Sequence, residues 1–248
     1  MKEAFWLKSE LMIEIGGFQR VSLIDYPGKV VSIIFTIGCN YRCPFCQNKD
    51  LVLRNYNNLR VYTYEEIFQK LDEAKNFIDG VEITGGEPTI WGEELIELIK
   101  KLKKYGLIKL DSNGSNPEIL EKLINQKLVD YIAMDIKTKL EPKKYAKAIG
   151  LSEEAIKTVF PRVLKSIELI RNSGIEHEFR TTVVPTIVEK SDIIEIANHI
   201  KGEKYALQQF EPKSTLNPEF EKLKPYPKEF FNEVYEEIKD IVKCELRV

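Results

Sequence analysis

The chain has 248 residues, 43% of them hydrophobic, and a formal net charge of −2 at pH 7. This length suits one domain with a sizeable core, so we expect residues 1–248 to form a single domain. The near-neutral net charge does not predict the basic surface that nucleic-acid binding requires. No apolar run reaches the length of a membrane span, and Met1–Glu10 lacks the apolar stretch of a signal peptide. We therefore expect a cytoplasmic protein with neither a nucleic-acid nor a membrane partner.

The N-terminal residues 1–29 are predicted to form a lead-in to the fold. Leu11–Ile15 is expected to be a short strand that ends at Gly16-Gly17. Pro27-Gly28 predicts a turn that feeds the first strand of the main sheet. Asp25 stands just before this turn, so its simplest role is that of a turn residue.

Three of the four cysteines follow the apolar run Val30–Thr36, which predicts a buried strand. Cys39, Cys43 and Cys46 have the spacing Cys-x-x-x-Cys-x-x-Cys. Thiolates so close together would repel one another unless a cation held them, and iron–sulfur clusters are held by Cys sulfur. Three ligands would leave one iron of a four-iron cluster open for chemistry. A zinc site, a disulfide and chance are the alternatives, but a structural zinc site needs four ligands and the two histidines lie far away in sequence.

Five more strands are predicted, each separated from the next by a helix or linker: Val81–Thr84, Leu107–Asp111, Asp130–Asp135, His177–Val184 and Tyr205–Phe210. Apolar spacing predicts helices over residues 63–78, 91–105, 116–126, 159–172, 191–200 and 227–242. Residues 47–62 are expected to be irregular and residues 136–152 a linker with solvated lysines. Six alternating units predict a parallel sheet with outer helices, fewer than the eight of a closed barrel. We expect an α/β fold: a partial (β/α)6 barrel over residues 30–211 with a C-terminal helical cover over residues 212–248.

The carboxyl ends of the predicted strands carry polar residues, and in barrels of parallel strands the site lies at those ends. This rule brings the cysteine loop together with Gly85-Gly86-Glu87, Asp111–Gly114, Asp135–Lys137, Thr181-Thr182-Val183 and Gln208–Glu211. Each of these segments alone has a plainer explanation, such as a glycine turn or a solvated lysine. Their convergence on one edge of the sheet is stronger evidence of a site than any single motif.

The cysteine spacing, with Phe45 before the last cysteine, resembles the signature of the radical S-adenosylmethionine (SAM) enzymes. In that family three cysteines hold a [4Fe–4S] cluster and SAM chelates the fourth iron. An electron from the cluster then cleaves SAM to methionine and a 5′-deoxyadenosyl radical. The resemblance implies that Cys39, Cys43 and Cys46 bind one such cluster. No catalytic acid, base or nucleophile is evident in the sequence, so the cofactors would carry the chemistry.

The resemblance also implies a set of SAM contacts. Gly85-Gly86-Glu87 matches a segment that binds the amino group of SAM, and Lys137 matches a lysine that contacts its carboxylate. Ser112 and Asn113 would bond the ribose or the methionine part. The complete predicted cofactor-binding set is Phe45, Cys46, Gln47, Gly85, Gly86, Glu87, Ser112, Asn113, Asp135, Lys137 and Phe210.

The chain departs from the family pattern at two positions. Gln47 stands where related activases often have His, and Glu211 stands where some relatives have His near the adenosine. Asp111 and Asp135 could hold a small cation, as in some relatives. The departures at Gln47 and Glu211 leave the assignment to a subfamily open.

Ser22–Lys29, followed by the cysteine loop, resembles the glycyl-radical-enzyme activases, in particular those of anaerobic ribonucleoside-triphosphate reductase. In that family the radical removes a Cα hydrogen from one glycine of a partner glycyl radical enzyme, and flavodoxin or ferredoxin donates the electron. Asp25 matches an acidic position that meets the partner's glycine loop. Two alternatives are a small-molecule enzyme similar to 7-carboxy-7-deazaguanine synthase, which would need a closed pocket, and a non-enzymatic iron–sulfur or zinc protein.

Overall fold

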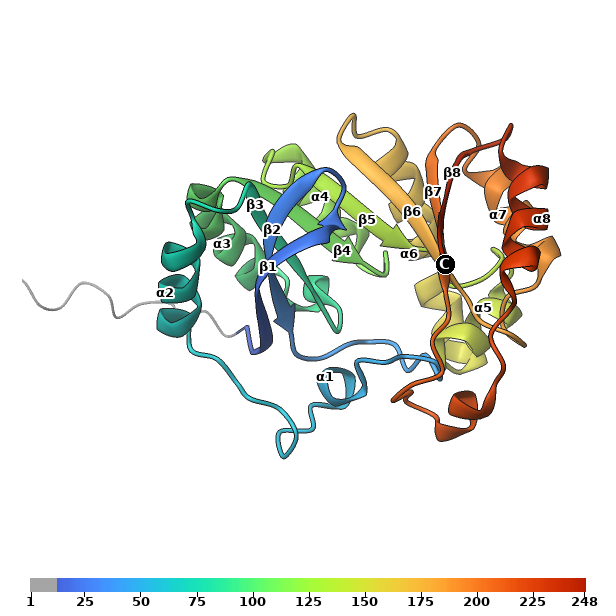
Figure 1. Ribbon diagram of the computed structural model, residues 1–248, viewed down its shortest axis with the longest axis horizontal. Helices are drawn as coiled ribbons and strands as arrows, with labels where there is room; N and C mark the ends of the chain where they lie inside the picture. Colours follow the sequence, from blue (N-terminus) through green and yellow to red (C-terminus); the bar gives the residue numbers. More distant parts are fainter. Residues whose placement is uncertain (1–12) are drawn as a thin grey trace, which may run out of the picture.

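The computed structural model describes residues 13–248 and contains one eight-stranded sheet whose strands lie in chain order (Figure 1). The strands are β1 Ile15–Tyr26, β2 Lys29–Thr36, β3 Gly80–Gly85, β4 Leu107–Ser112, β5 Tyr131–Asp135, β6 Glu176–Val183, β7 Lys204–Gln209 and β8 Lys243–Arg247. From β2 to β8 all neighbours are parallel, whereas β1 pairs with β2 as an antiparallel hairpin. Within residues 13–248, β1 and β8 each pair on one side only, so the barrel is open as predicted.

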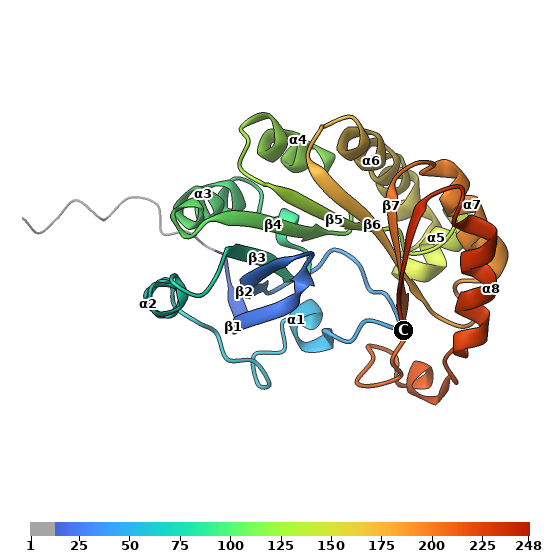
Figure 2. The same cartoon turned by 45° about the horizontal axis from the view of Figure 1, so that its top comes forward.

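Helices connect the strands and form an outer layer on the convex side of the curved sheet (Figure 2). They are α1 Lys49–Leu53, α2 Tyr64–Ala74, α3 Glu93–Leu102, α4 Pro117–Asn125, α5 Pro142–Ile149, α6 Glu153–Arg171, α7 Lys190–His199 and α8 Lys228–Ile238. Short 3-10 helices lie at η1 Pro88–Trp91, η2 Lys103–Tyr105 and η3 Pro218–Lys222. None of the helices in residues 13–248 combines the length and the apolar character that a bilayer span requires.

Successive side chains of a strand point to opposite faces of the sheet, and here the two faces differ in character. On β4, Ile108 and Leu110 are fully buried in the large core between the sheet and the helices. Lys109 and Asp111 alternate with them and lie on the concave face. A smaller apolar cluster, which includes Tyr26 and Tyr131, closes the inside of the barrel at the amino ends of its strands. The concave face at the carboxyl ends therefore stays polar.

The N-terminal prediction was wrong in its boundaries. The expected strand Leu11–Ile15 lies partly outside the described residues, and the strand in the structure begins at Ile15 and continues through Gly16-Gly17 to Tyr26. Asp25 is therefore a strand residue, although the turn at Pro27-Gly28 is confirmed. Residues 18–25 lack the apolar alternation of a strand because most of their side chains are exposed and bulges interrupt the pairing with β2.

The linker expected over residues 136–152 contains the helix α5, and α6 starts at Glu153 instead of residue 159. Tyr145, Ala148 and Ile149 of α5 are fully buried, while its lysines lie on the opposite side. The many lysines concealed this amphipathic pattern. Ser152 caps α6 by accepting a hydrogen bond from the amide of Ala155.

Three further elements differ from the prediction. The short helix α1 lies within the segment expected to be irregular. Helix α7 begins at Lys190, after Glu189 rather than after a Ser191 cap. The last helix ends at Ile238 instead of residue 242, and β8 then extends the sheet beside β7. This strand is short, polar and at the sheet edge, so it has little apolar pattern to reveal it.

We expect Leu110→Ala to lower the free energy of unfolding by about 2–5 kcal/mol, because the lost side chain leaves a cavity beneath the helices. Leu53→Ala is the matched control, since Leu53 is 52% exposed and should change stability by less than about 0.5 kcal/mol. Urea denaturation followed by circular dichroism measures both. Equal effects of the two substitutions would contradict the assignment of the convex face as the core.

Candidate active site

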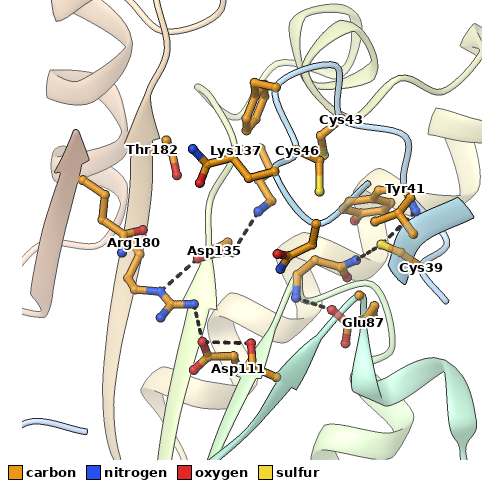
Figure 3. Close-up of a pocket in the computed structure, with 18 of the residues that line it drawn as sticks. Cys39, Tyr41, Cys43, Cys46, Glu87, Asp111, Asp135, Lys137, Arg180 and Thr182 are labelled. Carbon is orange, nitrogen blue, oxygen red and sulfur yellow. Dashed lines mark hydrogen bonds and ion pairs between the residues drawn. The ribbon is translucent and has the colours of Figure 1, made fainter. Parts of the chain in front are cut away.

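A cavity of about 450 Å³ lies at the carboxyl ends of the parallel strands (Figure 3). The structure brings all the predicted site residues to its wall: Asp25, Cys39, Cys43, Phe45, Cys46, Gln47, Gly85, Gly86, Glu87, Ser112, Asn113, Asp135, Lys137 and Phe210. These residues come from six separate segments of the chain. Apart from Asp25, which only the family resemblance placed here, the strand-end rule brought these residues together correctly.

Two other segments hold the cysteine loop that follows β2. The amide of Arg42 donates to the carbonyl of Ile149, the last residue of α5, at 2.8 Å. The amides of Leu216 and Asn217 donate to the carbonyls of Cys46 and Pro44, each at 2.9 Å. The loop is therefore fixed by the chain on both sides of the cavity and does not depend on its own short-range contacts alone.

The three thiols are largely buried. Burial raises the pKa of Cys39 and of Cys43 to about 12, and it also raises the pKa of Cys46. Lys137 acts in the opposite direction on all three, because its positive charge favours a thiolate. The thiols thus need a cation in their midst before they lose their protons.

The donor set fits an iron–sulfur cluster better than a single ion. Among residues 13–248, no three Cys, His, Asp or Glu side chains gather closely enough to hold one bare metal ion. The three thiols nevertheless line the same cavity. Because a cluster contains several irons and its own sulfides, its thiolate ligands are spread more widely than those of one ion.

The two glycines at the end of β3 are required by the packing of the protein itself. A Cβ atom on Gly86 would lie 1.9 Å from the carbonyl oxygen of Gly38, and one on Gly85 would lie 2.3 Å from the amide nitrogen of Thr36. Gly85 also has a φ of +124°, which L side chains rarely adopt. The plain packing explanation therefore accounts for both glycines, whether or not a ligand also approaches them.

Glu87 ties the end of β3 to the end of β4. Its buried carboxylate accepts hydrogen bonds from the Ser112 hydroxyl at 2.9 Å and the Asn113 amide at 2.7 Å. It also accepts from the amide of Thr89 at 3.1 Å. Burial raises the pKa of Glu87, although these hydrogen bonds oppose the change. The side chain shapes the cavity wall in this structure, and its predicted contact with the amino group of SAM stays a prediction.

Gln47 and Phe210 connect the cysteine loop to the end of β7. The Gln47 side-chain amide donates from Nε2 to the carbonyl of Glu211 at 2.8 Å. Phe210 is 1% exposed and belongs to the main core. Both residues therefore fix one wall of the cavity.

A chain of ion pairs crosses the floor of the cavity (Figure 3). Arg180 on β6 lies 2.9 Å from Oδ2 of Asp111 and 3.0 Å from Oδ1 of Asp135. Lys137 donates from Nζ to Oδ2 of Asp135 at 2.8 Å. Burial favours the neutral carboxylic acid, but Arg180 and then Lys137 hold the pKa of Asp135 below its ordinary value. Burial likewise opposes the charge of Lys137, but Asp135 and Cys43 raise its pKa above the usual range.

Arg180, which joins carboxylates from two other strands, was not among the predicted site residues. The only signal for it is its place on the concave face of β6, between the buried Phe179 and Thr181. Its neighbour on the same face, Thr182, also lines the cavity. The alternation of polar and buried residues at the end of β6 could therefore have predicted that Arg180 faces the cavity.

Glu82 and Lys109 extend the charge chain into the barrel. Lys109 is fully buried, and its Nζ lies 3.0 Å from Oε1 of Glu82 and also bonds Asp111. Within the described residues, Oε2 of Glu82 has no hydrogen-bond partner. Burial, with Asp111 as the next cause, raises the pKa of Glu82 to about 9. Burial therefore disfavours the ionised form of Glu82, although Lys109 opposes this shift.

We expect Glu82→Gln to flatten the pH dependence of stability. The folded-state pKa of Glu82 is about 9, against an ordinary value of 4.5. Between these values the folded protein binds the proton more tightly than the unfolded chain, so stability is lost as pH rises, by up to about 1.4 kcal/mol per pH unit. Urea denaturation from pH 6 to 9 measures this, with the exposed Glu97→Gln as control. A slope that Glu82→Gln leaves unchanged would mean that Glu82 is ionised throughout.

Comparison with known proteins identifies relatives of the chain. Residues 33–200 match the Radical SAM superfamily. A Methanocaldococcus jannaschii protein with the provisional name glycyl-radical enzyme activating enzyme MJ1227 is 39% identical over 217 residues, which cover 87% of this chain and 87% of that protein. The pyruvate formate-lyase-activating enzyme of Clostridium pasteurianum is 30% identical over 198 residues, which cover 77% of this chain and 78% of that protein.

Solved structures show the same fold. Streptococcus suis SuiB superposes with a TM-score of 0.59 at 18% identity over 86% of this chain and 47% of SuiB, so this chain spans about half of that protein. The fold, the matched region and the two relatives agree with one another. The chain therefore belongs to the radical SAM superfamily.

Proposed function

We propose that this chain is a glycyl-radical-enzyme activase that binds one [4Fe–4S] cluster through Cys39, Cys43 and Cys46. The radical SAM family implies such a cluster and SAM. The observation that carries the proposal is the single cavity that unites the three thiols, the glycine motif and Asp25. Both relatives described above carry the names of activating enzymes, which supports the same conclusion.

In the proposed reaction, cluster and SAM together supply the 5′-deoxyadenosyl radical, with one electron from a donor such as flavodoxin or ferredoxin and methionine as the co-product. That radical takes a hydrogen atom from the Cα of a glycine in the partner, which leaves 5′-deoxyadenosine and a glycyl radical. A glycine suits this step because no side chain blocks the approach to its Cα hydrogen. Anaerobic ribonucleoside-triphosphate reductase is the partner we propose, in the cytoplasm, where thiols stay reduced.

In this scheme the side chains and backbone of the protein bind SAM and orient it. Lys137 would place its ammonium against the carboxylate of SAM, and Asp135 would hold Lys137 in position. Arg180 would fix Asp135 from the next strand. The carbonyls of Gly85 and Gly86 would accept from the amino group of SAM, while Phe45, Phe210, Ser112 and Asn113 would complete the wall around it.

The small-molecule alternative predicts a different use of the same cavity. An enzyme similar to 7-carboxy-7-deazaguanine synthase would enclose its substrate, whereas an activase must admit a segment of another protein. Asp25 lines the cavity but is itself only half-buried on the edge hairpin, so the cavity reaches the protein surface there. This contact with the surface favours a protein substrate.

The direct test of the proposed function is an anaerobic assay of SAM cleavage. After reconstitution with iron and sulfide, we expect dithionite-reduced protein to form 5′-deoxyadenosine and Cys43→Ala to lose at least about a hundred-fold of that activity, because one cluster ligand is gone. Cys244→Ala is the matched control, since this half-buried thiol lies on β8 away from the cavity. Full activity of Cys43→Ala, or equal losses in both variants, would contradict the proposal.

We expect Lys137→Met to raise the KM for SAM by about ten-fold to a hundred-fold, the equivalent of one lost charge-assisted hydrogen bond. Lys139→Met is the control, because Lys139 does not line the cavity and its ion-pair partner within residues 13–248 is Glu141. Initial rates of 5′-deoxyadenosine formation over a range of SAM concentrations measure the change. A KM that neither substitution alters would remove Lys137 from the SAM site.

A further inference from the structure

The segment 20–25 of β1 departs from the regular pairing of the hairpin. Gln19 pairs with Ile33 on β2. Tyr26 pairs with Lys29, so seven residue steps on β1 face only four on β2. The surplus residues form bulges. Bulges redirect side chains and are frequent beside active sites, so this irregularity is a candidate functional feature.

Side chains hold the bulged segment in its shape. The buried Ser22 donates its hydroxyl to Asp25 and accepts the amide of Ile24 at 3.3 Å. Gln19 donates from Nε2 to the carbonyl of Val21 at 3.1 Å. Two backbone groups of this edge are therefore already bonded within β1, which makes pairing with an added strand less favourable. A partner molecule would therefore contact the side chains of residues 20–25 and not their backbone.

The bulge leaves two apolar side chains in water beside the cavity. Leu23 is 71% exposed and Ile24 is 86% exposed. Asp25 follows them directly and lines the cavity with the cysteines. The Cα atoms of Leu23 and Asp25 can be no more than about 7 Å apart. Single exposed apolar residues are ordinary, but an adjoining pair held at the rim of an active site is typical of a contact surface.

We propose that Leu23 and Ile24 dock the glycyl radical enzyme by packing against apolar side chains that flank its target glycine. This inference rests on the activase function proposed above and adds the surface through which the partner is held. Asp25, the next residue, lines the cavity that the glycine has to enter, so a partner segment that reaches Asp25 would lie beside both side chains. Asp25 would then accept a backbone N–H of the same segment. A second copy of this chain seated here would obstruct that entry.

The test uses the double variant Leu23→Ser/Ile24→Ser with the glycyl radical enzyme encoded in the same genome as the probe. We expect the partner concentration for half-maximal glycyl radical formation, measured by electron paramagnetic resonance, to rise at least ten-fold. SAM cleavage without the partner should stay at the wild-type rate, because neither residue lines the cavity. Phe77→Ser is the matched control, since Phe77 is equally apolar and 70% exposed but lies after α2.

Other results would overturn the docking surface. One is an unchanged partner concentration in the double variant, or an equal rise in Phe77→Ser. Another is a wild-type dimer that the double variant converts to a monomer in light scattering, because a second copy would then cover the pair. If the wild-type protein cleaves SAM but forms no glycyl radical, the activase function itself fails, and that result is distinct from a change in half-maximal concentration.

Discussion

The burial of three cysteine thiols at the end of β2 is the constraint on which the rest of the site depends. A buried thiol retains its proton unless positive charge lies near, and burial raises the pKa of both Cys39 and Cys43 to about 12. Lys137 supplies part of that charge from below. It can do so in a buried site only because Asp135 and Arg180 hold it within a chain of ion pairs on rigid strands. The state of the cysteine thiols in the loop therefore depends on the ion pairs in the floor of the cavity.

The same strands build the core and the site because they present two unlike faces. On β4, Leu110 faces the helices, while Lys109 and Asp111 lie on the concave face, where Asp111 lines the cavity. In closed barrels the inner face is itself a packed apolar core. Here that packing is confined to the small cluster around Tyr26 and Tyr131, and the open carboxyl ends keep their charges. The open barrel thereby combines a dry outer core with a polar interior.

Local patterns predicted the six central strands, the cysteine loop and the residues that meet at the cavity, because these depend on short-range spacing and on one rule about strand ends. The roles of those residues remain predictions. Asp25 was not predicted to lie in a strand, because the bulge that contains it is defined only by the pairing with β2. Arg180 was not predicted as a site residue because its two partners come from other strands. Helix α5 was not predicted because its many lysines concealed the apolar pattern of its buried side. The glycines of the β3 turn show a further limit: their tight contact with Gly38 and Thr36 is visible only once both strands are packed.

The central claim is hydrogen abstraction from a protein glycine, and one isotope measurement tests it most directly. The partner glycyl radical enzyme from the same genome would be prepared with glycine deuterated at Cα and incubated anaerobically with the reduced, cluster-loaded protein and SAM. Mass spectrometry of the 5′-deoxyadenosine should then show one deuterium per molecule, in step with the glycyl radical signal. Product without deuterium, formed at the same rate with and without the partner, would contradict the account and point to a small-molecule substrate.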